Sequence, residues 1–219
     1  MNLLQEMISW VPSLLRGARI TISLTLVSVA AGIFLGLFLA LGKISKNRVL
    51  NKICSAYIFF FRGTPLLMQL YFIYYSFPQI HPALTINSRF MAAFIAFTLN
   101  SGAYSAEIIR SAIQSIDKGQ REASKVLGMS YAQTMRLVII PQSIRRLIPP
   151  LGNEYIMVLK DVSLVSIIAL TDITKVTKSL SSTTASPWPY VPAMVIYLII
   201  TGIFTYVFNK LETKFSVYD

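Results

Sequence analysis

The chain has 219 residues, of which 54 % are apolar and 13 % are charged, and its mean hydropathy is +0.61. These values exclude an ordinary soluble domain and predict a protein surrounded largely by lipid. The formal net charge of +11 would suit a nucleic-acid-binding protein, but the basic residues are divided among loops instead of forming one patch. We therefore expect no nucleic acid among its partners.

The first 19 residues have neither the basic start nor the small-residue cleavage site of a signal peptide. Apolar residues recur there at helical spacing beside Trp10. We predict a short interfacial helix that the mature protein retains. The alternative is a simple extension of the first membrane span.

Five stretches are apolar enough to cross the hydrocarbon core of a bilayer, which requires about 20 residues of helix. They are residues 20–41, 58–77, 90–109, 147–170 and 191–208. We therefore predict an all-α membrane protein with five transmembrane helices in a single domain over residues 1–219. A single cysteine, Cys54, excludes an internal disulfide and a metal site built from cysteines.

Basic residues are distributed unevenly between the two sides that these spans define. Thirteen follow spans one, three and five, whereas five lie on the opposite side. Positively charged loops stay in the cytoplasm when a membrane protein inserts. The amino terminus is therefore expected outside the membrane and the carboxyl terminus in the cytoplasm.

The second span is interrupted at residues 62–65, with the sequence RGTP. A threonine before a proline is typical of a helix start, with Thr64 as the N-cap and Pro65 at the first helical position. We predict a break that turns an amino-terminal helix end toward a pathway through the membrane, with Met68 and Tyr71 completing its wall. The alternative is a kink near the cytoplasmic surface that leaves the arginine among lipid headgroups.

The third span carries a polar stripe, because Asn100, Tyr104 and Glu107 recur at i, i+4 and i+7. The small residues beside this stripe favour close contact with another helix. Asn100 lies deepest and is a candidate to bind either a substrate or a neighbouring backbone. Glu107 is better explained by Arg110, which lies one turn further toward the cytoplasmic end.

The loop between spans three and four, residues 117–141, is polar and contains helix start and stop signals. Two pairs of residues have the spacing of a capping box: Asp117 with Gln120, and Ser130 with Gln133. We predict two short helices joined at Gly128, a natural helix stop. A structured loop of this kind indicates a docking surface for a cytoplasmic partner, and an ordinary solvated loop is the alternative.

Two carboxylates, Glu154 and Asp161, interrupt the fourth span. A carboxylate in hydrocarbon costs on the order of 2.5 to 3.5 kcal/mol, so such residues usually face a cavity. A separation of seven positions is nearly two helical turns, which places both on one face roughly 10 Å apart. Lys160 is turned off that face. The alternative is that Glu154 pairs with a basic residue of another helix, and that Asp161 and Lys160 merely end the span.

Three ordered blocks of the sequence resemble those of a known family. They are FRGTPLLMQLYF from Phe61, NSGAYSAEIIRSAIQSIDKGQREA from Asn100 and PPLGNEYIMVLKDVSLVSII from Pro149. Together with Glu122-Ala123-Ser124, Gly128 and Ile139-Ile140-Pro141, they are similar to type I ABC importer permeases of the polar amino-acid subfamily, which includes permeases for histidine, arginine, lysine and glutamine. The resemblance covers most of residues 14–210.

The sequence departs from this family pattern in small ways. In the family, the cytoplasmic loop is called the EAA loop after its Glu-Ala-Ala triplet, and Ser124 replaces the second alanine of that triplet. Asp117 stands where a proline is common, and Ile140 replaces a leucine. None of these changes removes a charge or a glycine that the loop needs.

The resemblance implies the type I ABC importer transmembrane fold and a permease subunit in the cytoplasmic (inner) membrane of a prokaryote. In that family the EAA loop docks on a cytoplasmic ATPase dimer. The residues expected to make this contact are Glu122, Ala123, Ser124, Lys125, Gly128, Met129 and Ser130. The other implied partners are a second permease subunit, either identical or a close paralogue, an external solute-binding protein, an amino-acid substrate and membrane lipid.

Two carboxylates on one inward face would suit a cationic amino acid such as arginine, lysine or histidine. The candidate substrate-binding residues are Glu154, Asp161, Asn100, Thr64, Met68 and Tyr71. No phosphate-binding GxxxxGK[ST] motif and no GxSxG or HExxH motif occurs, so we expect no catalytic residue, metal or cofactor in this chain. ATP and Mg²⁺ would bind the partner ATPase.

Two other classes of function fit parts of the sequence. A secondary amino-acid transporter driven by an ion gradient would use Glu107, Glu154 and Asp161 to relay protons or sodium. A structural membrane anchor would need no pathway, and the cost of placing carboxylates in the membrane argues against it.

Overall fold

The computed structural model describes residues 3–216, with side chains up to Lys214. Within this range the chain is helical and contains no strand. The α-helices are α1 (Leu3–Ile44), α2 (Arg48–Gly63), α3 (Leu66–Tyr71), α4 (Phe77–Ile80), α5 (Arg89–Gln114), α6 (Lys118–Val126), α7 (Tyr131–Thr134), α8 (Ile140–Asp161), α9 (Ile173–Thr184) and α10 (Tyr190–Ser216). Shorter segments between them are the π-helical turns Phe72–Ser76 and Met135–Ile139 and the 3₁₀ helices Pro82–Leu84 and Val162–Ile168.

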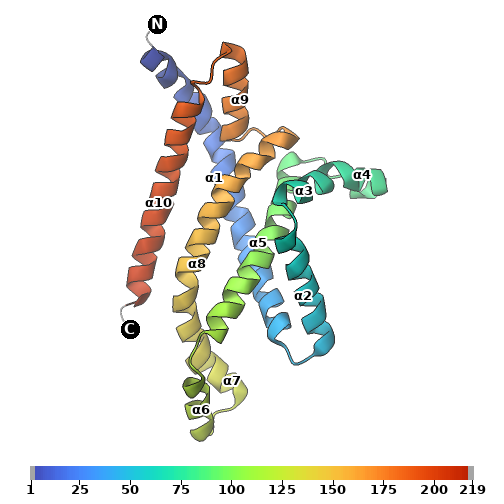
Figure 1. The fold of residues 1–219 in the computed structure, drawn as a ribbon, viewed down its shortest axis with the longest axis vertical. Helices are drawn as coiled ribbons and strands as arrows, with labels where there is room; N and C mark the ends of the chain where they lie inside the picture. The colour runs from blue at the N-terminus through green and yellow to red at the C-terminus, as the bar shows by residue number, and fades with distance from the viewer. Residues whose placement is uncertain (1–2, 217–219) are drawn as a thin grey trace.

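The long helices α1, α5, α8 and α10 run beside one another along the molecule (Figure 1). The turn between α1 and α2 lies at the same end as α6 and α7, whereas α9 and the start of α1 lie at the other end. The basic residues of the α1–α2 turn and those of the loop therefore share one end of the molecule.

The first helix differs from the predicted arrangement. α1 is continuous from Leu3 to Ile44, so the amino-terminal segment extends the first span and does not form a separate interfacial helix. Its apolar stripe, Trp10, Leu14 and Ala18, is buried in a cluster with residues of α9 and α10. The separate interfacial helix was therefore a wrong prediction, because α1 is unbroken and Trp10 and Leu14 of its first turns pack within the protein, although Leu4, Ile8 and Leu15 are exposed.

α1 and α5 form the most extensive helix pair in the described chain. Gly36 of α1 lies so close to α5 that an added Cβ would stand 2.7 Å from the Cβ of Ser105 and 2.9 Å from the backbone nitrogen of Ala106. Gly32 approaches Ser101 in the same way. The close helix contact predicted from the small residues of the third span is confirmed.

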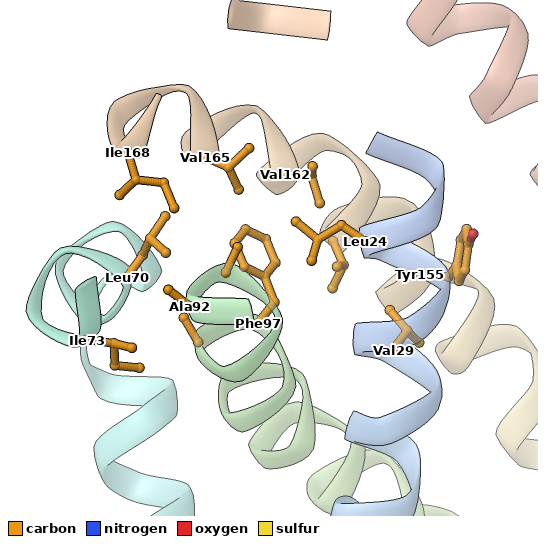
Figure 2. Close-up of a cluster of buried hydrophobic side chains, with 13 residues drawn as sticks. Leu24, Val29, Leu70, Ile73, Ala92, Phe97, Tyr155, Val162, Val165 and Ile168 are labelled. Carbon is orange, nitrogen blue, oxygen red and sulfur yellow. The ribbon is translucent and has the colours of Figure 1, made fainter. Parts of the chain in front are cut away.

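The largest apolar cluster joins α1, α3, α5 and α8 (Figure 2). Leu24 of α1, Leu70 of α3 and Phe97 of α5 are almost completely buried in it. Val162 and Val165, from the 3₁₀ helix that follows α8, are fully buried in the same cluster. This core fixes α3 and the end of α8 relative to α5.

The second predicted span is broken. α2 and the helical stretch Leu66–Ile80 meet at an angle of 101°. Thr64 ends α2, where its hydroxyl donates to the carbonyl oxygen of Phe60 at 2.8 Å, and Pro65 takes the N-cap position of α3 without a side-chain cap. The predicted break is thus confirmed. The assignment of Thr64 as the N-cap is wrong, because its hydroxyl donates one turn back instead of capping the next helix.

By length and composition, two of the described helices, α1 and α10, would cross a membrane alone, and α2 with residues 66–80 would do so as a bent pair. The predicted spans at 90–109 and 147–170 lie on α5 and on α8 with its following 3₁₀ helix. Both contain charged residues, which lowers their mean hydropathy. The count of five spans remains a prediction.

We predict that Gly36→Val lowers the stability of the folded protein by about 1–3 kcal/mol, because atoms of α5 occupy the space that a side chain needs. Gly202→Val is the matched control, since nothing lies within 4 Å of a Cβ added at Gly202. Thermal unfolding of the purified variants in one detergent measures the difference. Equal melting temperatures for the two variants would contradict the close contact between α1 and α5.

Candidate functional site

A cavity of about 440 Å³ lies where the break between α2 and α3 faces α5 and α8. Its volume is within the range of small-molecule sites, roughly 300 to 1,000 Å³. The lining residues are Arg62, Gly63, Thr64, Pro65, Leu66, Leu67, Asn100, Tyr104, Glu154, Met157, Val158, Asp161 and Leu164. Four of the six residues predicted to bind a substrate therefore line this cavity, namely Thr64, Asn100, Glu154 and Asp161.

Glu154 and Asp161 line the cavity from α8. Glu154 is only 6 % exposed and lies beside Ser101 of α5. Neither carboxylate forms an ion pair with any residue in the described part of the chain. Both side chains thus face the same space, as their spacing predicts, and both are available to a cationic group. Lys160 is exposed and does not line the cavity.

Two amide side chains hold the broken helix. Gln69 of α3 donates from Nε2 to the carbonyl oxygens of Phe61 and Thr64, at 3.0 and 3.1 Å. Asn100 of α5 donates to the same Phe61 carbonyl and to Oε1 of Gln69, each at 3.0 Å. In an unbroken helix the Phe61 carbonyl would accept from residue 65, but Pro65 has no N–H. Gln69 and Asn100 therefore replace the donor that the proline removes.

This network determines which hydrogen-bonding atom of Asn100 remains available to a ligand. Its amide nitrogen is occupied by Phe61 and Gln69, which makes it a support for the backbone of the break. Its Oδ1 accepts no hydrogen bond from the described side chains or backbone, and Asn100 lines the cavity. Asn100 can therefore offer the cavity a hydrogen-bond acceptor, which again favours a donor such as an ammonium group.

Glu107 of α5 lies near three cations, of which Arg62 lines the cavity. Arg110 donates to it from Nε and Nη2, at 3.1 and 2.7 Å, and Lys43 of α1 pairs with its other oxygen. Arg62 of α2 is further away, with Nη1 at 3.8 Å, and its guanidinium lies 5.3 Å from the centre of the Tyr104 ring. The predicted pairing of Glu107 with Arg110 is confirmed, whereas the parts played by Lys43, Arg62 and Tyr104 were not predicted.

Met68 and Tyr71 lie outside this cavity. Both are largely exposed, and they line a separate groove together with Leu67 and Ile167. Because successive helix residues are turned by about 100°, only the first turn of α3 reaches the cavity wall. Their role in substrate binding stays a prediction without support from the cavity.

The loop between α5 and α8 contains the two predicted helices and the glycine stop. α6 ends in a Schellman motif, in which the N–H of Met129 donates to the Ser124 carbonyl and that of Gly128 to the Lys125 carbonyl, each at 3.0 Å. Gly128 has φ = +72°, a conformation that favours glycine. Ser130 and Gln133 form the complete capping box at α7.

The pair Asp117 and Gln120 does not form the capping box that its spacing predicts. Asp117 accepts from the N–H of Gly119 at 2.7 Å, while the side chain of Gln120 accepts from Gln142 of α8. Asp117 thus caps α6 without the reciprocal bond that its spacing with Gln120 predicts. The glutamine instead links α6 to the start of α8.

The tip of the loop exposes apolar side chains. Val126, Leu127 and Tyr131 are 87 %, 78 % and 77 % exposed. An exposed apolar patch beside charged residues is typical of a protein contact. Of the residues predicted to touch an ATPase, Ser124 is buried and Met129 half-buried, and the exposed ones are Glu122, Ala123, Lys125, Gly128 and Ser130.

The second helix of the loop continues into α8. Residues 131–161 form one helical path in which the π turn Met135–Ile139 joins α7 to α8. This turn precedes Pro141 just as the π turn Phe72–Ser76 precedes Pro78. A wider turn relieves the clash between a proline ring and the carbonyl four residues earlier. The predicted loop 117–141 therefore shares its second helix with α8, which also lines the cavity.

Comparison with known proteins places the chain in a family. The model of the family described as "binding-protein-dependent transport system inner membrane component" matches residues 32–217. The glutamine transport system permease protein GlnP of Escherichia coli (strain K12) is 35 % identical over 210 residues, which cover 94 % of each chain. The arginine transport system permease protein ArtQ of Bacillus subtilis (strain 168) is 36 % identical over 210 residues and covers 95 % of each.

A further relative from the same Bacillus subtilis strain, the L-cystine transport system permease protein TcyB, is 39 % identical over 212 residues, which are 96 % of this chain and 89 % of TcyB. A solved structure described as an amino acid ABC transporter with histidines matches at a TM-score of 0.91 and 39 % identity, over 98 % of this chain and 99 % of that one. The MetNI methionine ABC transporter in an inward-facing conformation matches at 0.79 and 20 % identity, over 93 % of this chain and 96 % of that one, and shows the fold alone.

These similarities support the type I ABC importer permease fold and decide against a gradient-driven transporter or a structural anchor. The chain belongs to the family of binding-protein-dependent transport system inner membrane components and is a permease subunit of an ABC amino-acid importer.

Proposed function

We propose that this chain is a five-span permease subunit that takes up polar, cationic L-amino acids, such as arginine, lysine or histidine, across the cytoplasmic (inner) membrane of a prokaryote. The observation that carries the substrate class is the cavity in which Glu154 and Asp161 have no ion-pair partner among residues 3–216. The amino terminus lies outside and the carboxyl terminus in the cytoplasm, in accord with the excess of basic residues on one side.

The chemistry of the cavity favours a cation over a neutral amino acid. A hydrogen bond to a charged group contributes about 1.5–3 kcal/mol, so each carboxylate gains by meeting an ammonium or guanidinium group. A neutral substrate such as glutamine has one cationic group and would leave one carboxylate unpaired inside the membrane. ArtQ is named for arginine and GlnP for glutamine, so the preference for a cation rests on the two carboxylates.

Energy for transport comes from a cytoplasmic ATPase dimer, which binds ATP and Mg²⁺ and docks on the α6–α7 loop. The exposed apolar residues Val126, Leu127 and Tyr131 would be covered by that contact, together with Glu122 and its neighbours. The helical path through residues 131–161 leads from this docking surface to the cavity wall. A displacement of the loop is therefore transmitted to Glu154 and Asp161. A second permease subunit, identical or a close paralogue, and an external solute-binding protein complete the importer.

We predict that Glu154→Gln and Asp161→Asn each weaken the apparent affinity for L-arginine by about 10-fold to 100-fold, because an amide keeps the shape but loses the charge. Glu212→Gln, which changes an exposed carboxylate of α10, is the matched control. Uptake of radiolabelled L-arginine into proteoliposomes, measured with the permease, its co-purified ATPase and the external solute-binding protein, gives the KM of each variant. An unchanged KM in both cavity variants would contradict the proposed substrate class.

Gly128 tests the docking loop separately. We predict that Gly128→Val abolishes most substrate-stimulated ATP hydrolysis, since a β-branched residue at φ = +72° distorts the turn between α6 and α7. Gly128→Asn is the control, because asparagine tolerates this conformation. Hydrolysis is measured in the reconstituted complex, with L-arginine binding as a second readout that both variants retain. Full coupling in Gly128→Val would show that the turn does not position the docking surface.

A further inference from the structure

Arg62 is the one guanidinium in the cavity wall, and its partners among the described residues are weak. It donates no hydrogen bond within residues 3–216. Its closest anion is Glu107, 3.8 Å away, and that carboxylate already has Lys43 and Arg110 as close partners. The Arg62 side chain is 43 % exposed, although a guanidinium has five N–H donors to satisfy. Its donors are therefore available to a ligand in the cavity.

The face of Tyr104 holds Arg62 in position. The guanidinium carbon lies 5.3 Å from the ring centre, within the range of a cation–π contact. A cation–π contact uses none of the guanidinium N–H groups as hydrogen-bond donors, so the paired N–H groups that can bind a carboxylate with two parallel hydrogen bonds remain available.

The cavity is consequently dipolar. Glu154 and Asp161 supply two negative charges from α8, and Arg62 supplies one positive charge from the end of α2. Arg62 is near enough to Glu154 to interact with it electrostatically. A cationic amino acid carries the opposite set of charges, namely two cationic groups and one α-carboxylate. The site and such a substrate match in number and sign.

We propose that Arg62 binds the α-carboxylate of the transported amino acid, while Glu154 and Asp161 bind its two cationic groups. This inference rests on the proposed function and adds a requirement to it, since the substrate must carry a free carboxylate as well as a positive side chain. Without Arg62, that carboxylate would enter a cavity whose other charged walls are both negative.

The test compares L-arginine with L-arginine methyl ester at about pH 6, where the more acidic α-ammonium group of the ester is still protonated, so that the ester keeps both cationic groups and lacks the carboxylate charge. Binding of each to the full-length chain in lipid nanodiscs is measured by isothermal titration calorimetry for wild type, Arg62→Gln and Arg62→Lys. Arg48→Gln, at an exposed arginine of the same helix, is the control for a general effect of charge.

We expect the wild type to bind L-arginine about 10-fold to 100-fold more tightly than the ester, and Arg62→Gln to lose this preference by weakening only arginine binding. Arg62→Lys should keep part of the preference, because an ammonium group supplies the charge without the paired geometry. Ester binding serves as a check that the cavity remains folded in each variant.

Two kinds of result would overturn the inference. If Arg62→Gln binds arginine as tightly as the wild type does, the guanidinium does not contact the substrate. If the variant binds arginine more tightly, the guanidinium repels the cationic substrate. If Arg62→Gln weakens arginine and the ester equally, its role is structural. Failure of the proposed function looks different, because the wild type would then bind neither L-arginine nor its ester, whatever residue stands at position 62.

Discussion

A backbone carbonyl inside a membrane needs a hydrogen-bond donor, and Pro65 removes one from the second span. The Phe61 carbonyl, which would have accepted from residue 65, is satisfied by Gln69 and Asn100. An unsatisfied carbonyl in hydrocarbon costs several kcal/mol, so this repair is a condition for the break to exist. Once satisfied, the break sets α2 and the following helix at 101° and leaves a cavity facing α5 and α8. The arrangement of the site depends on these few bonds.

The same helices connect this cavity to the loop at the basic end of the molecule. α8 carries Glu154 and Asp161 at one end, and through the π turn Met135–Ile139 it is continuous with α7 at the other. α5 carries Asn100 beside the break and ends before α6. The same helices thus connect the loop with the cavity. In the proposed importer, this continuity allows a cytoplasmic ATPase to act on a substrate that it never touches.

The sequence was sufficient where a local rule applies. Helix signals located Gly128 and Ser130, and the seven-residue spacing placed Glu154 and Asp161 on one face. It was insufficient where the outcome depends on contacts between distant segments. The sequence suggests that Trp10 lies at the membrane interface, whereas in the structure it packs against α9 and α10. The sequence also shows no partner for Arg62, because Tyr104 comes from the distant helix α5. For Gln69 a usable signal existed, because a proline always leaves the carbonyl four residues earlier in need of a donor.

The most direct measurement is a structure of the permease–ATPase complex in nanodiscs with saturating L-arginine, determined by electron cryomicroscopy. The account predicts ligand density in the cavity between α2, α5 and α8, within hydrogen-bond distance of Glu154 and Asp161, with Gln69 and Asn100 still bonded to the backbone at the break. Ligand density on another surface of the permease, with this cavity empty, would contradict it.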